Sequence, residues 1–185
     1  IFAQYKIYEL AKQQGVTVLL DGQGADEILA GYPKYIHWYL QELFVAGKKR
    51  LLKKEKKALL NNEFSFNWSI KNYLAALLPK QAAAQIEKDA AYDVQHNKQL
   101  TKEFRKAFYN RQTIYKPIYT KLNDALYYNS MQTGLEELLR YADRNSMAHG
   151  REVRLPFLNH DLVQFVFSLP SQYKINNGWT KWILR

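Results

Sequence analysis

The sequence contains no cysteine among its 185 residues. Disulfide bonds, thiolate metal sites and a cysteine nucleophile are therefore excluded within this chain. It also lacks any apolar run long enough to span a membrane. Its first residues, IFAQYKIYEL, lack the charged start and unbroken apolar stretch of a signal peptide. These absences are typical of a cytoplasmic protein, and we expect that location and no membrane partner.

Acidic residues are the less abundant charged class, with 17 Asp and Glu against 27 Lys and Arg and a net charge of +10. A basic balance is typical of proteins that bind nucleic acid, anionic membranes or phosphate-bearing substrates. Seven of the cations lie in the segment KKRLLKKEKK, Lys48–Lys57, whose leucines predict an amphipathic helix with a solvated basic face. We expect no nucleic-acid partner, because neither aromatics on that face nor a known module accompanies the run. A basic helical binding module is the alternative from a different functional class.

Glycine and proline are scarce, at 8 and 5 residues, and they mark element boundaries. Gly15 is placed to end a helix predicted over residues 1–14. The β-rich run VTVLL, Val16–Leu20, then predicts a strand, because an almost entirely apolar run is typical of a parallel strand covered on both faces. A glycine-containing loop and another helix follow. Helix, strand, loop and helix together indicate a piece of an α/β unit.

The middle of the chain, from about Tyr35 to Tyr141, has a helical pattern throughout. The expected helices are His37–Phe44, Lys48–Leu60, Ile70–Leu78, Gln81–Tyr92 and Gln99–Tyr109. Further on, Asp161–Ser168 predicts a helix and Ile175–Gly178 a turn, whereas Arg154–Phe157 should be extended beside Pro156. The chain is therefore expected to be mainly α-helical, with about one buried parallel strand.

The segment DGQGADE, which begins at Asp21, is the strongest candidate for a functional site. It leaves the carboxyl end of the predicted strand, where open α/β sheets bind their ligands. Gly22 and Gly24 let the backbone approach a phosphate closely. Asp26 and Glu27 beside a phosphate make chemical sense when Mg²⁺ lies between them. The plain alternative is a turn with capping acids, because a GxG spacing is a weak signal.

Two blocks of sequence resemble one known family. LLDGQGADEILAGYPKY, Leu19–Tyr35, resembles the S-G-E-G-x-D-E stretch and following Gly-Tyr pair of glutamine-hydrolysing asparagine synthetases. YADRNSMAHGREVRLPFLNHDLV, Tyr141–Val163, resembles the D-R-x-S-M-A-x-G-x-E-x-R-x-P-F-L-D block of the same family. The chain also begins without methionine and stops at WILR inside a helical pattern. We therefore expect residues 1–185 to be an internal piece of the C-terminal synthetase domain, without the glutaminase domain.

The resemblance implies both a fold and a reaction. The implied parent fold is α/β, similar to the adenine-nucleotide α-hydrolases and of the ATP-pyrophosphatase type. The implied reaction adenylates the side-chain carboxylate of aspartate with ATP and Mg²⁺, releases pyrophosphate, and lets ammonia displace AMP to give asparagine. The ammonia would come from glutamine in a glutaminase domain of the full-length chain. A homodimer is compatible with the resemblance.

The resemblance also assigns roles at the first block. Asp21 and Gly22 would line the nucleotide together with Gly24, and Asp26 would be the Mg²⁺–pyrophosphate ligand. Asp21 stands where the family more often has serine, and Gln23 where it usually has a catalytic glutamate. A glutamine amide does not titrate, so Gln23 could orient the substrate but not act as a base. This departure keeps open a related amidotransferase that acts on another carboxylate.

The second block supplies the other catalytic candidate, Arg144, which could face pyrophosphate. Asp143 and Arg144 are therefore expected to approach the Asp21–Glu27 loop, whereas Arg154 is expected to pair with Glu152 in a structural role. The family's S-G-G-x-D-S phosphate loop would precede residue 1, and its catalytic lysine would follow residue 185. Little contact with substrate is expected from Lys181. We thus expect the 185-residue chain alone not to synthesise asparagine.

Overall fold

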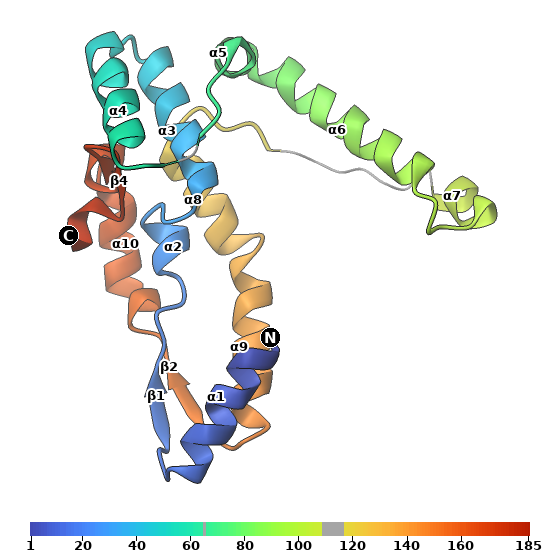
Figure 1. Cartoon of the computed structure of the whole chain (residues 1–185), viewed down its shortest axis with the longest axis vertical. Coiled ribbons are helices and arrows are strands. Elements are labelled where there is room, and N and C mark those ends of the chain that lie inside the picture. The colour runs from blue at the N-terminus through green and yellow to red at the C-terminus, as the bar shows by residue number, and fades with distance from the viewer. Residues whose placement is uncertain (65, 109–116) are drawn as a thin grey trace.

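The computed structural model describes residues 1–64, 66–108 and 117–185, and the side chains of Ala90 and Phe108 lie outside the description. Its helices are α1 Phe2–Gln13, α2 Ala25–Ile28, α3 Pro33–Val45, α4 Lys49–Asn61, α5 Ile70–Leu77, α6 Pro79–His96, α7 Lys102–Phe108, α8 Leu122–Met131, α9 Leu135–Met147 and α10 His160–Ser168. The predicted helices of the middle are thus confirmed to within a few residues at each end, and Tyr109 lies outside the described part. Figure 1 shows an elongated body from which α6 and α7 project as an arm.

A parallel pair of strands joins the two sequence blocks. β1, Val18–Leu20, pairs residue by residue with β2, Glu152–Arg154, so that Val18 lies opposite Glu152. The parallel pairing is confirmed, but the expected burial is wrong, because Val18 is 39% and Leu20 74% exposed. Helix α9 contacts β2 and α1 contacts α9, while the side chains of Val18 and Leu20 stay exposed. The apolar run therefore forms a strand that is covered on one face.

More strands are present than the sequence indicated. Besides β1 and β2, the described residues contain the antiparallel hairpin of β3, Ile175–Asn176, and β4, Trp179–Thr180. The turn predicted at its tip is confirmed, and Asn177 and Gly178 both have positive φ, at 49° and 72°. That conformation is the one that tight hairpins with the right-handed strand twist require. After β2 the chain enters a 3-10 helix, Pro156–Leu158, so only the first part of the Arg154–Phe157 stretch is extended.

The main core surrounds α3, which packs against α4, α5 and α8. The buried apolar side chains of this core are Ala30, Tyr35, Ile36, Tyr39, Leu40, Leu43, Leu52, Leu59, Leu122, Leu126 and Ile175. Burial of each such large side chain contributes roughly 1.5–3 kcal/mol before entropy is subtracted. Ile175 belongs to the hairpin, so the core holds the C-terminal hairpin against the helices.

Two buried polar residues, Ser171 and Lys174, tie the C-terminal part to the helices. Glu42 of α3 accepts hydrogen bonds from the Leu122 N–H at 2.7 Å and from the Ser171 hydroxyl at 2.9 and 3.0 Å. Lys174 is fully buried, and its ammonium donates to the Asn123 side-chain oxygen. Burial lowers the pKa of Lys174 to about 8, although the Glu42 charge opposes the shift. These groups were not predicted, because buried ion-forming side chains are rare and leave no periodic signal.

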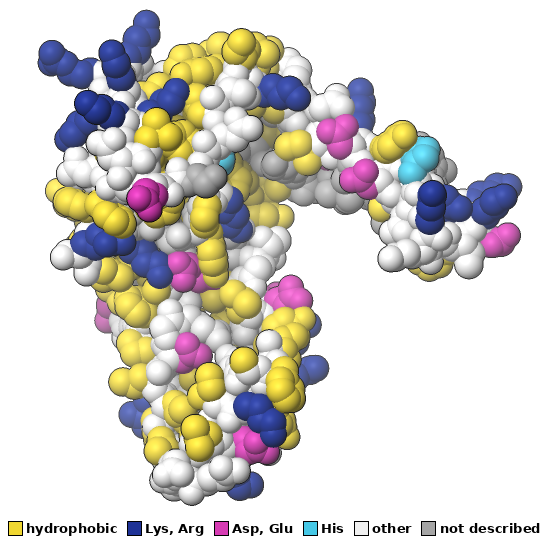
Figure 2. All heavy atoms as spheres, in the orientation of Figure 1, with side chains coloured by type: hydrophobic (Ala, Val, Ile, Leu, Met, Phe, Trp, Pro, Cys, Tyr) yellow, Lys and Arg dark blue, Asp and Glu magenta, His cyan; other side chains and the backbone are white. Residues whose placement is uncertain are grey.

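The basic segment forms α4 as an amphipathic helix. Leu52 and Leu59 are buried, and six cations of the segment are exposed: Lys48, Lys49, Arg50, Lys53, Lys54 and Lys57. In Figure 2 Lys and Arg side chains gather at the upper left, over the position of α4 in Figure 1. Glu55 is the exception on this helix, since it is fully buried and accepts hydrogen bonds from the Asn177 and Gly178 N–H groups, both at 3.0 Å.

The arm is built mainly from α6, which Pro79 opens at its first turn, a position that suits proline. Among the described side chains of α6, none is buried. A pocket of about 360 Å³ lies where the arm leaves the body, with Trp38, Ile86 and Tyr119 among its lining residues. Within the described residues, no helix combines the length and the apolar character needed to cross a bilayer.

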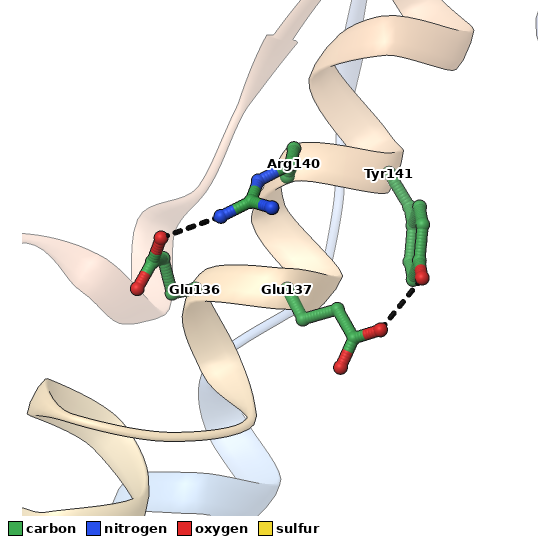
Figure 3. A network of polar contacts seen from close by, with 4 residues as sticks. All are labelled: Glu136, Glu137, Arg140 and Tyr141. Carbon is green, nitrogen blue, oxygen red and sulfur yellow. Dashed lines mark hydrogen bonds and ion pairs between the residues drawn. The ribbon is translucent and has the colours of Figure 1, made fainter. Parts of the chain in front are cut away.

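Helix α9 carries an exposed polar face at its beginning. Arg140 pairs with Glu136 at 2.7 Å, and the Tyr141 hydroxyl donates to Glu137 at 2.6 Å, both one helical turn apart, as Figure 3 shows. An exposed ion pair of this spacing, such as that of Arg140 and Glu136, contributes only about 0.3–0.5 kcal/mol. Ala142 of the same helix is buried. Helix α9 therefore turns one face toward the body and the face with these polar pairs toward solvent.

Candidate functional site

The first block continues from the parallel strands into a loop held by the second block. The Asp21 N–H donates to the Arg154 carbonyl at 3.0 Å, so the loop begins at the carboxyl ends of both strands. Gly24 has φ +89°, and a Cβ there would lie 2.2 Å from Cδ2 of Leu158. Glycine is required at this position for its φ and for the close approach of Leu158. The structure therefore brings the two blocks together through Arg154 and Leu158.

Asp21, Gly22 and Gln23 form the open part of this loop. The Gln23 amide donates to a carboxylate oxygen of Asp21 at 3.2 Å, and its own oxygen is buried without a hydrogen-bond partner in the described chain. Burial, followed by the charge of the nearby Asp21, raises the pKa of Tyr8. A Cβ built on Gly22 would meet nothing within 4 Å, so there is open space beside its backbone.

Asp26 lies in the first turn of α2, as expected, and its side chain is 34% exposed. Its Oδ1 is 2.9 Å from Nζ of Lys181, which follows the C-terminal hairpin. A Cβ on Gly31 would lie 1.7 Å from the same oxygen and 2.5 Å from Cε of Lys181. The glycine of the Gly-Tyr pair therefore leaves the room that this ion pair occupies.

Glu27, the next residue, is buried and accepts a hydrogen bond from the Tyr32 hydroxyl at 2.7 Å. Burial, and then this bond, raise the pKa of the Tyr32 phenol. Both residues line a pocket of about 250 Å³ together with Lys34 and Glu137. The pocket is thus lined by carboxylates, a hydroxyl and an ammonium group.

In the second block, the predicted pair of Arg154 and Glu152 is present at 2.7 Å. Asp143 lines a separate pocket of about 650 Å³, beside Ser146 and Glu152. Arg144 is exposed, and among the described residues its guanidinium forms no ion pair. No hydrogen bond or ion pair of the described chain joins Asp143 or Arg144 to the loop, so their expected approach to it stays a prediction, as does a catalytic role for Arg144.

The two blocks nevertheless share a further connection through α1. The Asn145 side chain donates to Gln4 at 3.0 Å, and Gln4 and Asp21 both act on the Tyr8 phenol. Met147 is 61% exposed at the last turn of α9. Only one face of α9 packs inward, and Met147 does not lie on it.

Magnesium would have a limited set of ligands here. Among the described residues, no group of three or more His, Asp or Glu side chains could hold a metal by itself. Asp26 offers one part-exposed carboxylate, with one of its oxygens already paired to Lys181. Mg²⁺ that arrives with a triphosphate needs only one or two protein carboxylates. Asp26 therefore fits nucleotide-borne Mg²⁺ better than a resident ion.

The ion pair of Lys181 was not predicted from the sequence. Little contact of Lys181 with substrate stays a prediction, and the structure places its ammonium 2.9 Å from the carboxylate predicted to bind metal. The available signal was the Asn177-Gly178 turn, which reverses the chain directly before Lys181. What the sequence did not show was that the reversed chain returns to α2.

The whole chain, residues 1–185, matches the asparagine synthase family. It is 27% identical to "Asparagine synthetase [glutamine-hydrolyzing] 1" of Bacillus subtilis (strain 168) over 209 aligned residues, which cover 99% of this chain and 30% of that protein. Over 52 residues, 28% of the chain, it is 46% identical to "Asparagine synthetase [glutamine-hydrolyzing]" of Gallus gallus. The chain thus spans less than a third of the length of these relatives. No solved structure matches it.

Proposed function

The chain belongs to the asparagine synthase family, and from this premise we propose that it forms part of the synthetase domain of a longer ATP-dependent amide ligase. That enzyme transfers AMP from ATP to a carboxylate, releases pyrophosphate, and lets ammonia displace the AMP to form an amide. The observation that carries the proposal is the junction of the two family blocks at Gly24 and Leu158, with open space beside Gly22.

Each residue of the loop has a role in this proposal. Gly22 lets the nucleotide approach the backbone, and Gly24 sets the turn from which α2 starts. Asp21 lines the nucleotide from the end of β1. Asp26 would hold the Mg²⁺ that accompanies the phosphates, and that cation would supply charge neutralisation at the pyrophosphate group. Arg144 stabilises pyrophosphate from the second block.

Aspartate is the first acceptor that we propose, and another carboxylate is the second candidate. The second candidate is favoured by Gln23, whose amide oxygen is buried without a partner in the described chain. An amide oxygen accepts hydrogen bonds but takes up no proton in the physiological range. Gln23 therefore orients an N–H or O–H group of the acceptor and does not act as a base.

The rest of the proposal concerns the full-length enzyme. Its fold is of the adenine-nucleotide α-hydrolase, ATP-pyrophosphatase type, and residues 1–185 are one part of that domain. Ammonia comes from glutamine in a separate glutaminase domain. We place the enzyme in the cytoplasm, where ATP and Mg²⁺ are available, and a homodimer is its proposed assembly.

The test is a pyrophosphate-release assay on the full-length protein with ATP, Mg²⁺ and ammonium. Aspartate is compared with a panel of other carboxylates, and the amide product is identified by mass spectrometry. We expect release that depends on the carboxylate, with one acid clearly preferred. The proposal is wrong if no carboxylate stimulates pyrophosphate release. The isolated 185-residue chain serves as the control and is expected to be inactive.

A further inference from the structure

The ion pair between Asp26 and Lys181 gives Lys181 a task at the proposed site. We propose that Lys181 is a positioning residue that orients Asp26 toward the Mg²⁺ carried by the nucleotide, an inference that rests on the proposed function. Nζ of Lys181 lies 2.9 Å from one oxygen of Asp26. The second oxygen has no hydrogen-bond partner in the described chain and is free to face a cation.

The position of Lys181 is fixed by the backbone around it. Lys181 has φ +51°, an unusual conformation for a side-chain-bearing residue, and the next N–H, of Trp182, donates to the Lys174 carbonyl at 3.0 Å. A residue in this region of φ is strained and persists only when its surroundings hold it there. The hairpin holds the backbone in this conformation, because Lys181 follows directly after β4.

The hairpin is in turn held by α4. The buried carboxylate of Glu55 accepts both N–H groups of the turn, from Asn177 and Gly178, each at 3.0 Å. A Cβ on Gly178 would lie 2.4 Å from the carbonyl carbon of Ala58, so the turn rests directly on the helix backbone. A carboxylate that accepts two backbone N–H groups makes strong, charge-assisted bonds. The hairpin therefore presents Lys181 to α2 at a defined place.

Gly31 lies directly against the ion pair of Asp26 and Lys181. Any side chain there would collide with Oδ1 of Asp26 and with Cε of Lys181, at 1.7 and 2.5 Å from the Cβ position. The φ of Gly31 is not in the left-handed region, so its backbone conformation does not itself require glycine. Gly31→Ala therefore separates the ion pair without removing either charge.

The experiment measures Mg²⁺-dependent ATP binding to the full-length protein by isothermal titration calorimetry, without acceptor so that no turnover occurs. Lys181→Met is expected to raise the half-saturating Mg²⁺ concentration by about 10–100-fold, as loss of a group that orients a metal ligand typically does. Gly31→Ala should give a shift in the same direction. Lys181→Arg keeps the charge and should recover most of the loss. Lys57→Met removes the same charge from an exposed position of α4 and should leave binding unchanged.

A double-mutant cycle separates positioning from direct binding. Because Lys181 acts through Asp26, Lys181→Met should add no further loss in an Asp26→Asn background. Additive losses, or normal Mg²⁺ dependence in Lys181→Met, would overturn the positioning role while leaving the proposed function intact. Absence of Mg²⁺-dependent ATP binding by the wild-type protein would overturn both. A thermal melt of each variant identifies any change that comes from unfolding.

Discussion

Helices α3 and α6 were predicted from the sequence equally well, but they differ in what they do for the fold. The 13 residues of α3 include five buried side chains, whereas none of the described side chains on the 18-residue α6 is buried. Figure 1 shows the same contrast, with α3 inside the body and α6 in the arm. Local propensity and suitable ends make both segments recognisable as helices in the sequence. A helix is buried only where other elements pack against it. The packing of α3, which follows α2 in the chain, is therefore what stabilises the part of the fold that carries the site.

The largest effect should come from a truncation in α3. Leu40 is fully buried in the main core, so Leu40→Ala leaves a cavity and is expected to lower the free energy of unfolding by about 2–5 kcal/mol. Chemical denaturation followed by circular dichroism measures the change. A loss below about 1 kcal/mol, the typical cost of an average substitution, would show that the body is less tightly packed around α3 than the buried side chains indicate.

The next effect concerns chemistry in the body. Asp26→Ala in the full-length protein should lower Mg²⁺-dependent pyrophosphate release by about 10²–10³-fold, the typical loss for one charge-stabilising group. The rate is measured at saturating ATP and ammonium. Lys53→Ala, on the exposed face of α4, is the control and should stay near the wild-type rate. Equal rates in both variants would show that Asp26 of α2 does not take part in the reaction.

A pH-dependent effect should come from the buried Lys174. Its pKa is about 8 in the folded chain and about 10.5 when unfolded, so between these values the unfolded state binds more protons. Stability should therefore rise by about 2–3 kcal/mol from about pH 8 to 10, and Lys174→Met should abolish the rise. Buried Tyr35 and Tyr39, with raised pKa values, act in the opposite sense above pH 10. The prediction is wrong if the difference in the free energy of unfolding between the wild type and Lys174→Met does not change with pH.

The smallest effect is expected in the arm. Ile86 of α6 is 41% exposed, so Ile86→Ala should change the free energy of unfolding by no more than about 0.5 kcal/mol. Hydrogen exchange followed by mass spectrometry should also show faster exchange in α6 than in α3, because exposed helices open locally at low free-energy cost. Equal protection of the two helices would mean that the arm packs against something in solution.

The sequence was informative wherever a local pattern decides the structure. Helix positions, the parallel direction of β1 and the turn at Asn177-Gly178 all follow from periodicity or from turn chemistry, and the structure has them. Burial of β1 was not predictable, because apolar content shows what a strand can bury and not what covers it. The contacts of Glu55 and Lys181 join segments far apart along the chain, so no local pattern carries them.

The parallel pairing of Val18 with Glu152 has a consequence for how the site assembles. Residues 18–152 must be brought into one loop before this pairing can form, and contacts of such long range form slowly. Helices α4 and α5 pack against α3 from nearby in the sequence, so these three helices can fold first. We therefore expect the junction of Gly24 and Leu158 to form late in folding. In a protein labelled during refolding, the amides of α3 would become protected before the Asp21 N–H, and the nucleotide site would be the last part to become competent.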